Sequence, residues 1–201
     1  TIFYAGSFYG GDRDPLPLFM ALDSLIEKGV ITENDIEVRI AGNFDNQLLD
    51  KINSFRSSSS VKLYGKIDRK KVLQLMQESH FLWLIMGKTV AHTAGYPIKF
   101  FEYLASRRPI LAFAPEGTEM VNTIRNLGIG EIFSLDSSRE SIENNARLLH
   151  RILDELDDKW LLPLNIEENK IKLFSRKYQA EQLREVLDEI SDSDEKDKVI
   201  K

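Results

Sequence analysis

The sequence PIKFFEYLASRRPILAF, residues 97–113, contains one helix and one strand in close succession. Proline at position 97 is typical of the first turn of a helix, and the residues up to Ala105 continue as a helix. After Pro109, the apolar run Ile110–Ala114 has the length and composition of a buried strand. A helix that leads directly into a buried strand is one half of a parallel βαβ unit.

The same alternation extends in both directions from this stretch. Strands are predicted at residues 2–5, 36–40, 61–64, 81–86, 110–114 and 131–135, and helices near 15–26, 48–55, 68–76, 97–105, 120–127, 138–156 and 175–190. Alternating strands and helices of this length predict an α/β fold. We expect a Rossmann-like, doubly wound and mainly parallel six-stranded sheet with helices on both faces.

Composition and length narrow the class of protein. The chain has 201 residues, 42% of them hydrophobic and 29% charged, with a net charge of −5. We expect one domain over residues 1–190 and a charged, disordered tail at 191–201. The acidic balance argues against a dedicated nucleic-acid binder. The lack of cysteine excludes disulfides, thiolate catalysis and zinc–thiolate sites.

Ligands of doubly wound sheets bind beyond the carboxyl ends of the strands, so the loops that follow the strands are candidate sites. In the first loop, residues 6–15, Gly6, Gly10 and Gly11 would let backbone N–H groups approach a phosphate, and Arg13 would add donors. The glycine spacing matches neither G-x-G-x-x-G nor a P-loop. The alternative interpretation is a flexible connection between a strand and a helix.

Two carboxylates in this loop, Asp12 and Asp14, form a D-x-D pattern that could hold a divalent ion. The same pattern recurs at residues 192–194, which shows how readily it arises in an acidic chain. We therefore expect no metal site.

A second candidate site is the start of the helix after the fourth predicted strand. The turn at Gly95 and the helix start at Pro97 would direct backbone amides toward a bound phosphate. Glu102 lies one turn further on, where a carboxylate can accept hydrogen bonds from two vicinal hydroxyls such as those of a ribose. The alternative is that Lys99 and Glu102 are a solvated charge pair on the helix surface.

Three segments together carry a resemblance. They are YAGSFYGGDRDPLPLFMAL (residues 4–22), VKLYGKIDRKKVLQLM (61–76) and PIKFFEYLASRRPILAF (97–113). In content, order and spacing they resemble the donor-binding, C-terminal domain of family-4-type retaining glycosyltransferases of the GT-B fold. The resemblance covers roughly residues 1–190, so the predicted sheet would be one half of a GT-B fold.

The resemblance implies roles for individual residues. Glu102 would bind the ribose of a nucleotide sugar, and Gly65, Lys66 and Ile67 would flank its base. His92, in the loop before Gly95, could reach the sugar or a phosphate. Contacts to the donor diphosphate would come from Gly6, Ser7, Arg13, Gly95, Tyr96, Pro97, Ile98 and Lys99.

The sequence departs from the family pattern at three positions. Ala94 stands where the family often has a glutamate that contacts the donor sugar, and Ser7 stands where it often has a basic residue. Arg107 replaces a glycine that usually follows the helix. The first two changes remove contacts to the sugar or the phosphates. Lys99 is a candidate for replacing part of the lost positive charge.

The function implied is transfer of a hexosyl group, with retention, from a nucleotide diphosphate donor to a glycan or glycolipid acceptor, without a cofactor or metal. The chain begins within a strand, so we expect it to be a piece of a longer protein whose N-terminal domain binds the acceptor. Without that domain, this chain would not catalyse the transfer.

We expect the full-length protein to be a bacterial, cytoplasmic enzyme of polysaccharide synthesis, peripheral to the inner face of the membrane. The alternatives are one half of a nucleotide-sugar epimerase-like enzyme and a non-catalytic domain of the same fold.

Overall fold

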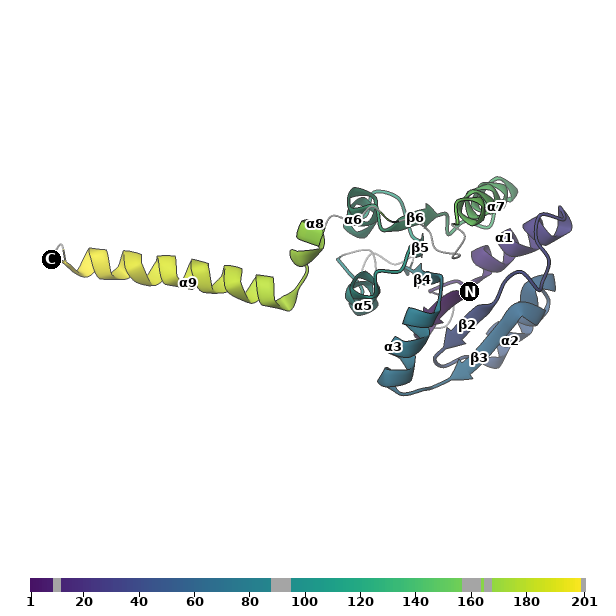
Figure 1. Ribbon diagram of the computed structural model, residues 1–201, viewed down its shortest axis with the longest axis horizontal. Coiled ribbons are helices and arrows are strands. Elements are labelled where there is room, and N and C mark those ends of the chain that lie inside the picture. The colour runs from purple at the N-terminus through teal and green to yellow at the C-terminus, as the bar shows by residue number, and fades with distance from the viewer. Residues whose placement is uncertain (9–11, 88–94, 157–163, 165–167, 200–201) are drawn as a thin grey trace. The chain divides into compact units, whose positions relative to one another are not determined.

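The computed structural model describes residues 1–8, 12–87, 95–156, 164 and 168–199 (Figure 1). It divides into two units, residues 1–165 and 166–201. The first unit contains a six-stranded sheet in the order β3-β2-β1-β4-β5-β6, and every neighbouring pair is parallel. The predicted fold class is therefore confirmed. The strands are β1 (Ile2–Ala5), β2 (Val38–Ala41), β3 (Val61–Gly65), β4 (Phe81–Ile85), β5 (Ile110–Phe113) and β6 (Gly130–Phe133).

Helices cover both faces of this sheet (Figure 1). On one face α1 packs against α7, and on the other α3 packs against α5. This division follows from right-handed crossovers on either side of β1. The elements of the first unit that connect the strands are α1 (Leu16–Glu27), α2 (Asn46–Asn53), the 3₁₀ helix η2 (Arg56–Ser60), α3 (Arg69–Glu78), α5 (Ile98–Ser106), α6 (Glu119–Leu127) and α7 (Arg139–Asp154).

Helix starts follow local capping chemistry. Asp68 and Ser138 cap α3 and α7, because their side chains accept hydrogen bonds from the backbone N–H groups of Lys71 (2.9 Å) and Ser141 (3.3 Å). The serine-rich stretch at residues 57–60 has the composition of a polar linker, but it forms part of η2. Asp23 of α1 holds it in place, with its carboxylate accepting from the backbone and hydroxyl of Ser57 at 2.8 and 2.7 Å.

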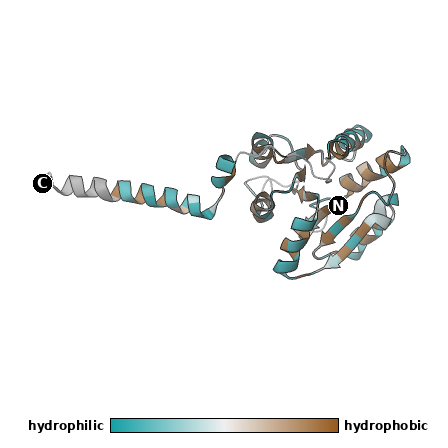
Figure 2. Ribbon diagram, in the orientation of Figure 1, coloured by the Kyte–Doolittle hydropathy of each residue, from teal (hydrophilic) through white to brown (hydrophobic). Residues whose placement is uncertain are grey.

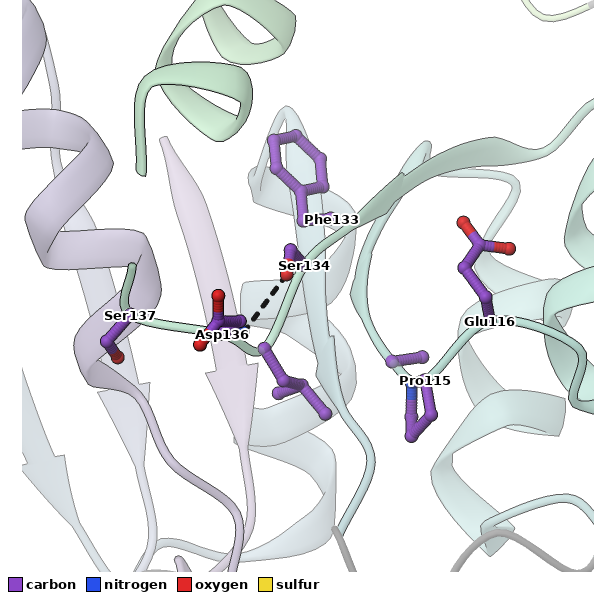
Figure 3. Close-up of a pocket in the computed structure, with 8 residues that line it drawn as sticks. Pro115, Glu116, Phe133, Ser134, Asp136 and Ser137 are labelled. Carbon is purple, nitrogen blue, oxygen red and sulfur yellow. Dashed lines mark hydrogen bonds between the residues drawn. The ribbon is translucent and has the colours of Figure 1, made fainter. Parts of the chain in front are cut away.

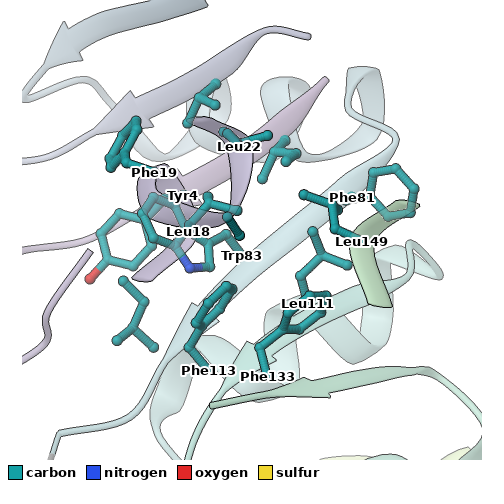
Figure 4. Packing of buried hydrophobic residues seen from close by; sticks show 14 of the residues in the cluster. Tyr4, Leu18, Phe19, Leu22, Phe81, Trp83, Leu111, Phe113, Phe133 and Leu149 are labelled. Carbon is teal, nitrogen blue, oxygen red and sulfur yellow. The ribbon is translucent and has the colours of Figure 1, made fainter. Parts of the chain in front are cut away.

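The core lies between the sheet and its helices, and all five residues of β4 are buried. Trp83 at its centre contacts aromatic rings from three other elements, Tyr4, Phe19 and Phe113, with centroids 5.4–6.1 Å away (Figure 4). Apolar residues accordingly follow the strands and the inner helix faces, while the outer faces are hydrophilic (Figure 2). Trp83 is thus a core residue, as expected for a parallel strand covered on both faces.

The second unit consists of α8 (Glu168–Lys172) and α9 (Arg176–Val199). The boundary between the units lies at residue 165, not at 190, and α9 continues to Val199 where the sequence predicts a disordered tail. Glutamate and lysine are good helix formers, so the charge of this segment indicates solvation without excluding a helix. Among the helices that the structure describes, none is both long and apolar enough to cross a membrane.

The loops after β1 and β2 meet backbone to backbone at two glycines. Gly6 and Gly42 have φ values of 146° and 149°, which side chains rarely allow. A Cβ atom on Gly42 would lie 1.9 Å from the carbonyl oxygen of Gly6. The close approach therefore requires glycine at position 42 and holds the Gly6 loop at the carboxyl edge of the sheet.

We predict that Gly42→Ala lowers the free energy of unfolding by about 3 kcal/mol or more, because it adds a steric clash to an unfavourable φ. Gly29→Ala is the matched control. Gly29 also has a positive φ, of 67°, but nothing lies within 4 Å of an added Cβ, so only about 1 kcal/mol should be lost. Urea unfolding of both variants tests this, and equal losses would contradict the role of the contact.

Candidate functional site

The candidate site lies where β1 and β4 separate. β1 pairs with β4 only at Ile2–Phe81 and Phe3–Leu82, although it pairs with β2 along its whole length. The connections after β1 and β4 lead to α1 and α5, on opposite faces of the sheet. Such a change in the direction of winding leaves a crevice at the carboxyl ends of the two strands, where ligands of doubly wound folds bind.

Tyr103 of α5 joins the two strands below this crevice. Its hydroxyl accepts a hydrogen bond from the backbone N–H of Ala5 (3.3 Å) and donates one to the carbonyl of Trp83 (3.2 Å). The side chain is fully buried, and this burial raises the pKa of the Tyr103 hydroxyl, which therefore keeps its proton. The Tyr103 hydroxyl thus replaces backbone hydrogen bonds that β1 and β4 no longer make with each other, and it fixes α5 against the sheet.

Lys99 lies one helical turn before Tyr103, on the same face of α5. Part of the residue is exposed, but its Nζ atom is buried and has no hydrogen-bond partner among the described residues. The Nζ atom lies 4.1 Å from the centroid of the Tyr4 ring. A Cβ atom on Gly6 would come within 2.6 Å of this nitrogen, so the glycine leaves the space that the amine occupies.

The surroundings of Lys99 disfavour its charge. Burial lowers the pKa of the Lys99 ammonium from 10.5 to about 7, and the nearby Arg13 guanidinium also lowers it, while Glu102 acts in the opposite direction. The amine also sits in the first turn of α5, where the helix dipole favours an anion. A bound anion would supply the hydrogen-bond acceptors and the opposite charge that this position needs.

Glu102 faces the neighbouring loop after β3. Its Oε1 lies 3.0 Å from Nη2 of Arg69, the first residue of α3, and its side chain is 30% exposed. The loop residues Gly65, Lys66 and Ile67 immediately precede this helix, and Gly65 accepts a hydrogen bond from the Gly42 N–H (2.8 Å). The structure therefore brings the predicted ribose-binding carboxylate next to the predicted base-binding loop.

Arg69 belongs to the basic run at residues 69–71, which could form an anion patch but whose sequence favours solvated helix charge. It directly follows the capping Asp68, at the end of the loop that enters the site. The pairing with Glu102 depends on the packing of α3 against α5, which local sequence does not specify.

The other predicted residues are divided between the loop after β1 and the start of α5. Tyr4 donates its hydroxyl hydrogen to the Ser7 carbonyl (3.0 Å), and the Arg13 N–H donates to the Phe8 carbonyl (3.2 Å), which folds the loop back on itself. The Asp14 carboxylate of the D-x-D pattern accepts from the Leu16 N–H (3.0 Å) and so stabilises the start of α1. No group of three or more potential metal ligands occurs among the described residues.

At the start of α5, Gly95 has a φ of 83° and Pro97 precedes the first helical residue. Ile98 is 83% exposed. The Tyr96 hydroxyl lies 2.8 Å from the Thr123 hydroxyl of α6, so this part of Tyr96 serves to hold the turn in place. His92 and Ala94 lie outside the described residues.

A hollow with a volume of about 670 Å³ lies on the same edge of the sheet, at the ends of β5 and β6 (Figure 3). Its carboxylates already have partners. Glu116 forms two hydrogen bonds of 2.7 Å with Arg125, and Asp136 accepts from the Ser141 hydroxyl (3.0 Å). The residues that line it are Ala114, Pro115, Glu116, Phe133, Ser134, Leu135, Asp136 and Ser137.

Comparisons with known proteins support the fold. No family model and no curated protein sequence matches this chain. Among solved structures, it is similar to the pneumococcal O-GlcNAc transferase GtfA in complex with UDP and GlcNAc, with 15% identity, a TM-score of 0.64 and 94% of this chain covered. It is also similar to a glycosyltransferase from Rickettsia africae, with 18% identity, a TM-score of 0.66 and 94% of this chain covered. The lipopolysaccharide outer core galactosyltransferase WaaB matches with 13% identity, a TM-score of 0.62 and 93% of this chain covered.

The chain spans 35%, 47% and 48% of the lengths of these three proteins. At these identities the likeness shows the fold. The first unit has the Rossmann-like α/β architecture of one half of a GT-B glycosyltransferase, as the sequence predicts.

We predict that Tyr103→Phe lowers the free energy of unfolding by about 1–3 kcal/mol, because it leaves a buried N–H and a buried carbonyl without their partner. Tyr178→Phe, in the second unit, removes a hydroxyl outside the sheet and is the control. Urea unfolding followed by Trp fluorescence measures both, and an unchanged midpoint for Tyr103→Phe would show that the bridge contributes nothing.

Lys99→Met should stabilise the empty protein. Because the unfolded chain holds the Lys99 proton more tightly, the buried charge destabilises the fold fully below about pH 7, and this cost is relieved as the pH rises toward 10.5. We expect a gain of roughly 2–4 kcal/mol near pH 6 and about half of that near pH 9. Unfolding curves at the two pH values test the prediction, and a loss of stability near pH 6 would contradict it.

Proposed function

We propose that this chain is the nucleotide-sugar-binding domain of a retaining glycosyltransferase that transfers a hexosyl group to a glycan or glycolipid acceptor. The observation that carries the proposal is the buried Lys99 amine, which lies at the start of α5, against the Gly6 loop and one turn from Glu102. A diphosphate at the amine and a ribose at the carboxylate are the two parts of a nucleotide that this spacing fits.

The positive charge in this site would act on the leaving group. As the bond to the sugar breaks, negative charge develops on the nucleoside diphosphate, and Lys99, Arg13 and the amides at the start of α5 are placed to stabilise it. Side chains of the protein would supply this charge, so the proposal requires no metal ion or cofactor. Holding the donor in one orientation relative to the acceptor would contribute the remaining acceleration.

Ribose and base would be bound by the other side of the site. The Glu102 carboxylate has two oxygens, and Arg69 occupies one of them at 3.0 Å, which leaves acceptor capacity for hydroxyls. Gly65, Lys66 and Ile67 precede Arg69 and would lie beside the base. UDP is the first nucleotide to test, because the similar structure of GtfA was determined with UDP and GlcNAc.

The rest of the enzyme would come from sequence beyond this domain. The chain spans at most 48% of the three similar proteins described above, so an N-terminal domain would supply the acceptor site and further catalytic groups. The proposed enzyme is bacterial, acts in polysaccharide synthesis, and would work in the cytoplasm, where nucleotide sugars are made, at the inner face of the membrane. The isolated domain would bind a nucleotide without turnover.

The cost of burying Lys99 also bears on the alternative of a non-catalytic domain. A buried amine without a hydrogen-bond partner destabilises the empty fold, and a domain with no ligand gains nothing in return. Strain or destabilisation of this kind is typical of functional sites.

Calorimetric titration with UDP, GDP and their sugars tests the proposal. We expect one nucleotide to bind in the micromolar to low-millimolar range, and Glu102→Gln to weaken it at least about tenfold by removing a charged acceptor. Glu143→Gln is the matched control, since Glu143 is also a partly exposed, ion-paired glutamate but lies on α7. Binding by none of the nucleotides would overturn the proposal, and equal effects of both variants would overturn the role of Glu102.

A further inference from the structure

Among the described residues, the groups around Lys99 only partly offset its charge in the empty site. From α5 itself, Tyr103 presents a hydroxyl whose hydrogen bonds go to the backbones of β1 and β4, and Glu102 is drawn to Arg69. From the loop after β1, Arg13 repels a positive charge. From β1, the Tyr4 ring offers only its face, 4.1 Å from the Nζ atom. No described group offers the amine a hydrogen-bond acceptor.

We propose that Lys99 couples binding of the donor diphosphate to the uptake of one proton. In the empty site at slightly alkaline pH the amine is uncharged, and a bound diphosphate converts it to an ammonium ion. The proton comes from the buffer and forms the third N–H bond of Nζ, so no other bond changes. The inference rests on the proposed function, because it requires that the diphosphate occupy this site.

A bound diphosphate would counter two of the contributions that disfavour the charge of Lys99, the lack of a hydrogen-bond acceptor and the repulsion from Arg13. Its oxygens would accept hydrogen bonds from Nζ, and its two negative charges would offset the repulsion from Arg13. Gly6 leaves the space that the amine occupies, since a Cβ atom at this position would come within 2.6 Å of the Lys99 nitrogen. Lys99 would therefore be a cation that forms when its ligand binds.

The coupling sets the direction of the pH dependence. Because the empty site holds the proton with a pKa of about 7, affinity for the diphosphate is full below that pH and falls about tenfold per unit above it. Uptake would be about 0.9 proton near pH 8 and about 0.1 proton near pH 6. The site would thus bind its donor best in neutral to slightly acidic solution.

Calorimetric titration of the full chain measures the uptake directly. The probe is the tightest-binding of UDP-GlcNAc, UDP-glucose and GDP-mannose, because the diphosphate diester of a nucleotide sugar carries no group that titrates near neutrality. Titrations near pH 8 in Tris and in HEPES differ in buffer ionisation enthalpy, and the difference in observed heat gives the number of protons taken up. We expect about 0.9 in the wild type.

Two variants test whether the proton that is taken up binds to Lys99. Lys99→Met should bind more weakly near pH 6, with no uptake at either pH, and Lys70→Met, an exposed lysine on α3, should behave as the wild type. Should Lys99→Met fold poorly, Lys99→Arg replaces it, since a permanent cation should also bind without uptake.

Tight binding without uptake in the wild type would overturn the inference and leave the proposed function standing. Uptake that persists in the Lys99 variants would assign the proton to another group and likewise overturn the inference. The failure of every nucleotide sugar to bind would overturn both.

Discussion

The hydrogen bonds of the Tyr103 hydroxyl hold the candidate site together. β1 and β4 must separate because their connections run to opposite faces of the sheet, and separation would leave backbone groups of Ala5 and Trp83 without partners in a buried position. Tyr103 satisfies both. In doing so it fixes the position and rotation of α5, and every other feature of the site depends on that rotation.

Once α5 is fixed by Tyr103, helical geometry determines where its polar residues lie. Lys99 is one turn closer to the carboxyl edge on the same face, so its amine enters the crevice beside the Gly6 loop. Glu102, one position before Tyr103, is rotated toward α3 and meets Arg69. A cation and a carboxylate are thereby held at different parts of one site, which is the separation that the diphosphate and the ribose of a nucleotide require.

The polar groups of the candidate site do not form a complete hydrogen-bond network, and the buried charge of Lys99 destabilises the empty fold. The buried Lys99 amine has no hydrogen-bond acceptor in the part of the chain that the structure describes, and glycines at 6 and 42 hold the backbone in conformations that other residues rarely adopt. Elsewhere the first unit follows the expected pattern, with a buried central strand β4, side-chain caps on helices such as α3 and α7, and an aromatic core around Trp83. Local departures from that consistency are expected where a ligand completes the structure.

The sequence by itself determined the class of fold and the order of strands and helices along the chain, and it predicts that a ligand binds at the carboxyl edge of the sheet. These depend on hydrophobic periodicity and on glycine, proline and capping residues, all of which act within a few residues of the chain. It did not predict that residues 191–199 continue a helix, because their charge is compatible with both states. Only the tertiary structure decided that Glu102 pairs with Arg69 and that the Lys99 amine is buried without a hydrogen-bond partner among the described residues. Both depend on how α5 packs against segments distant in sequence, and solvent exclusion, which sets the charge of Lys99, arises only from that packing.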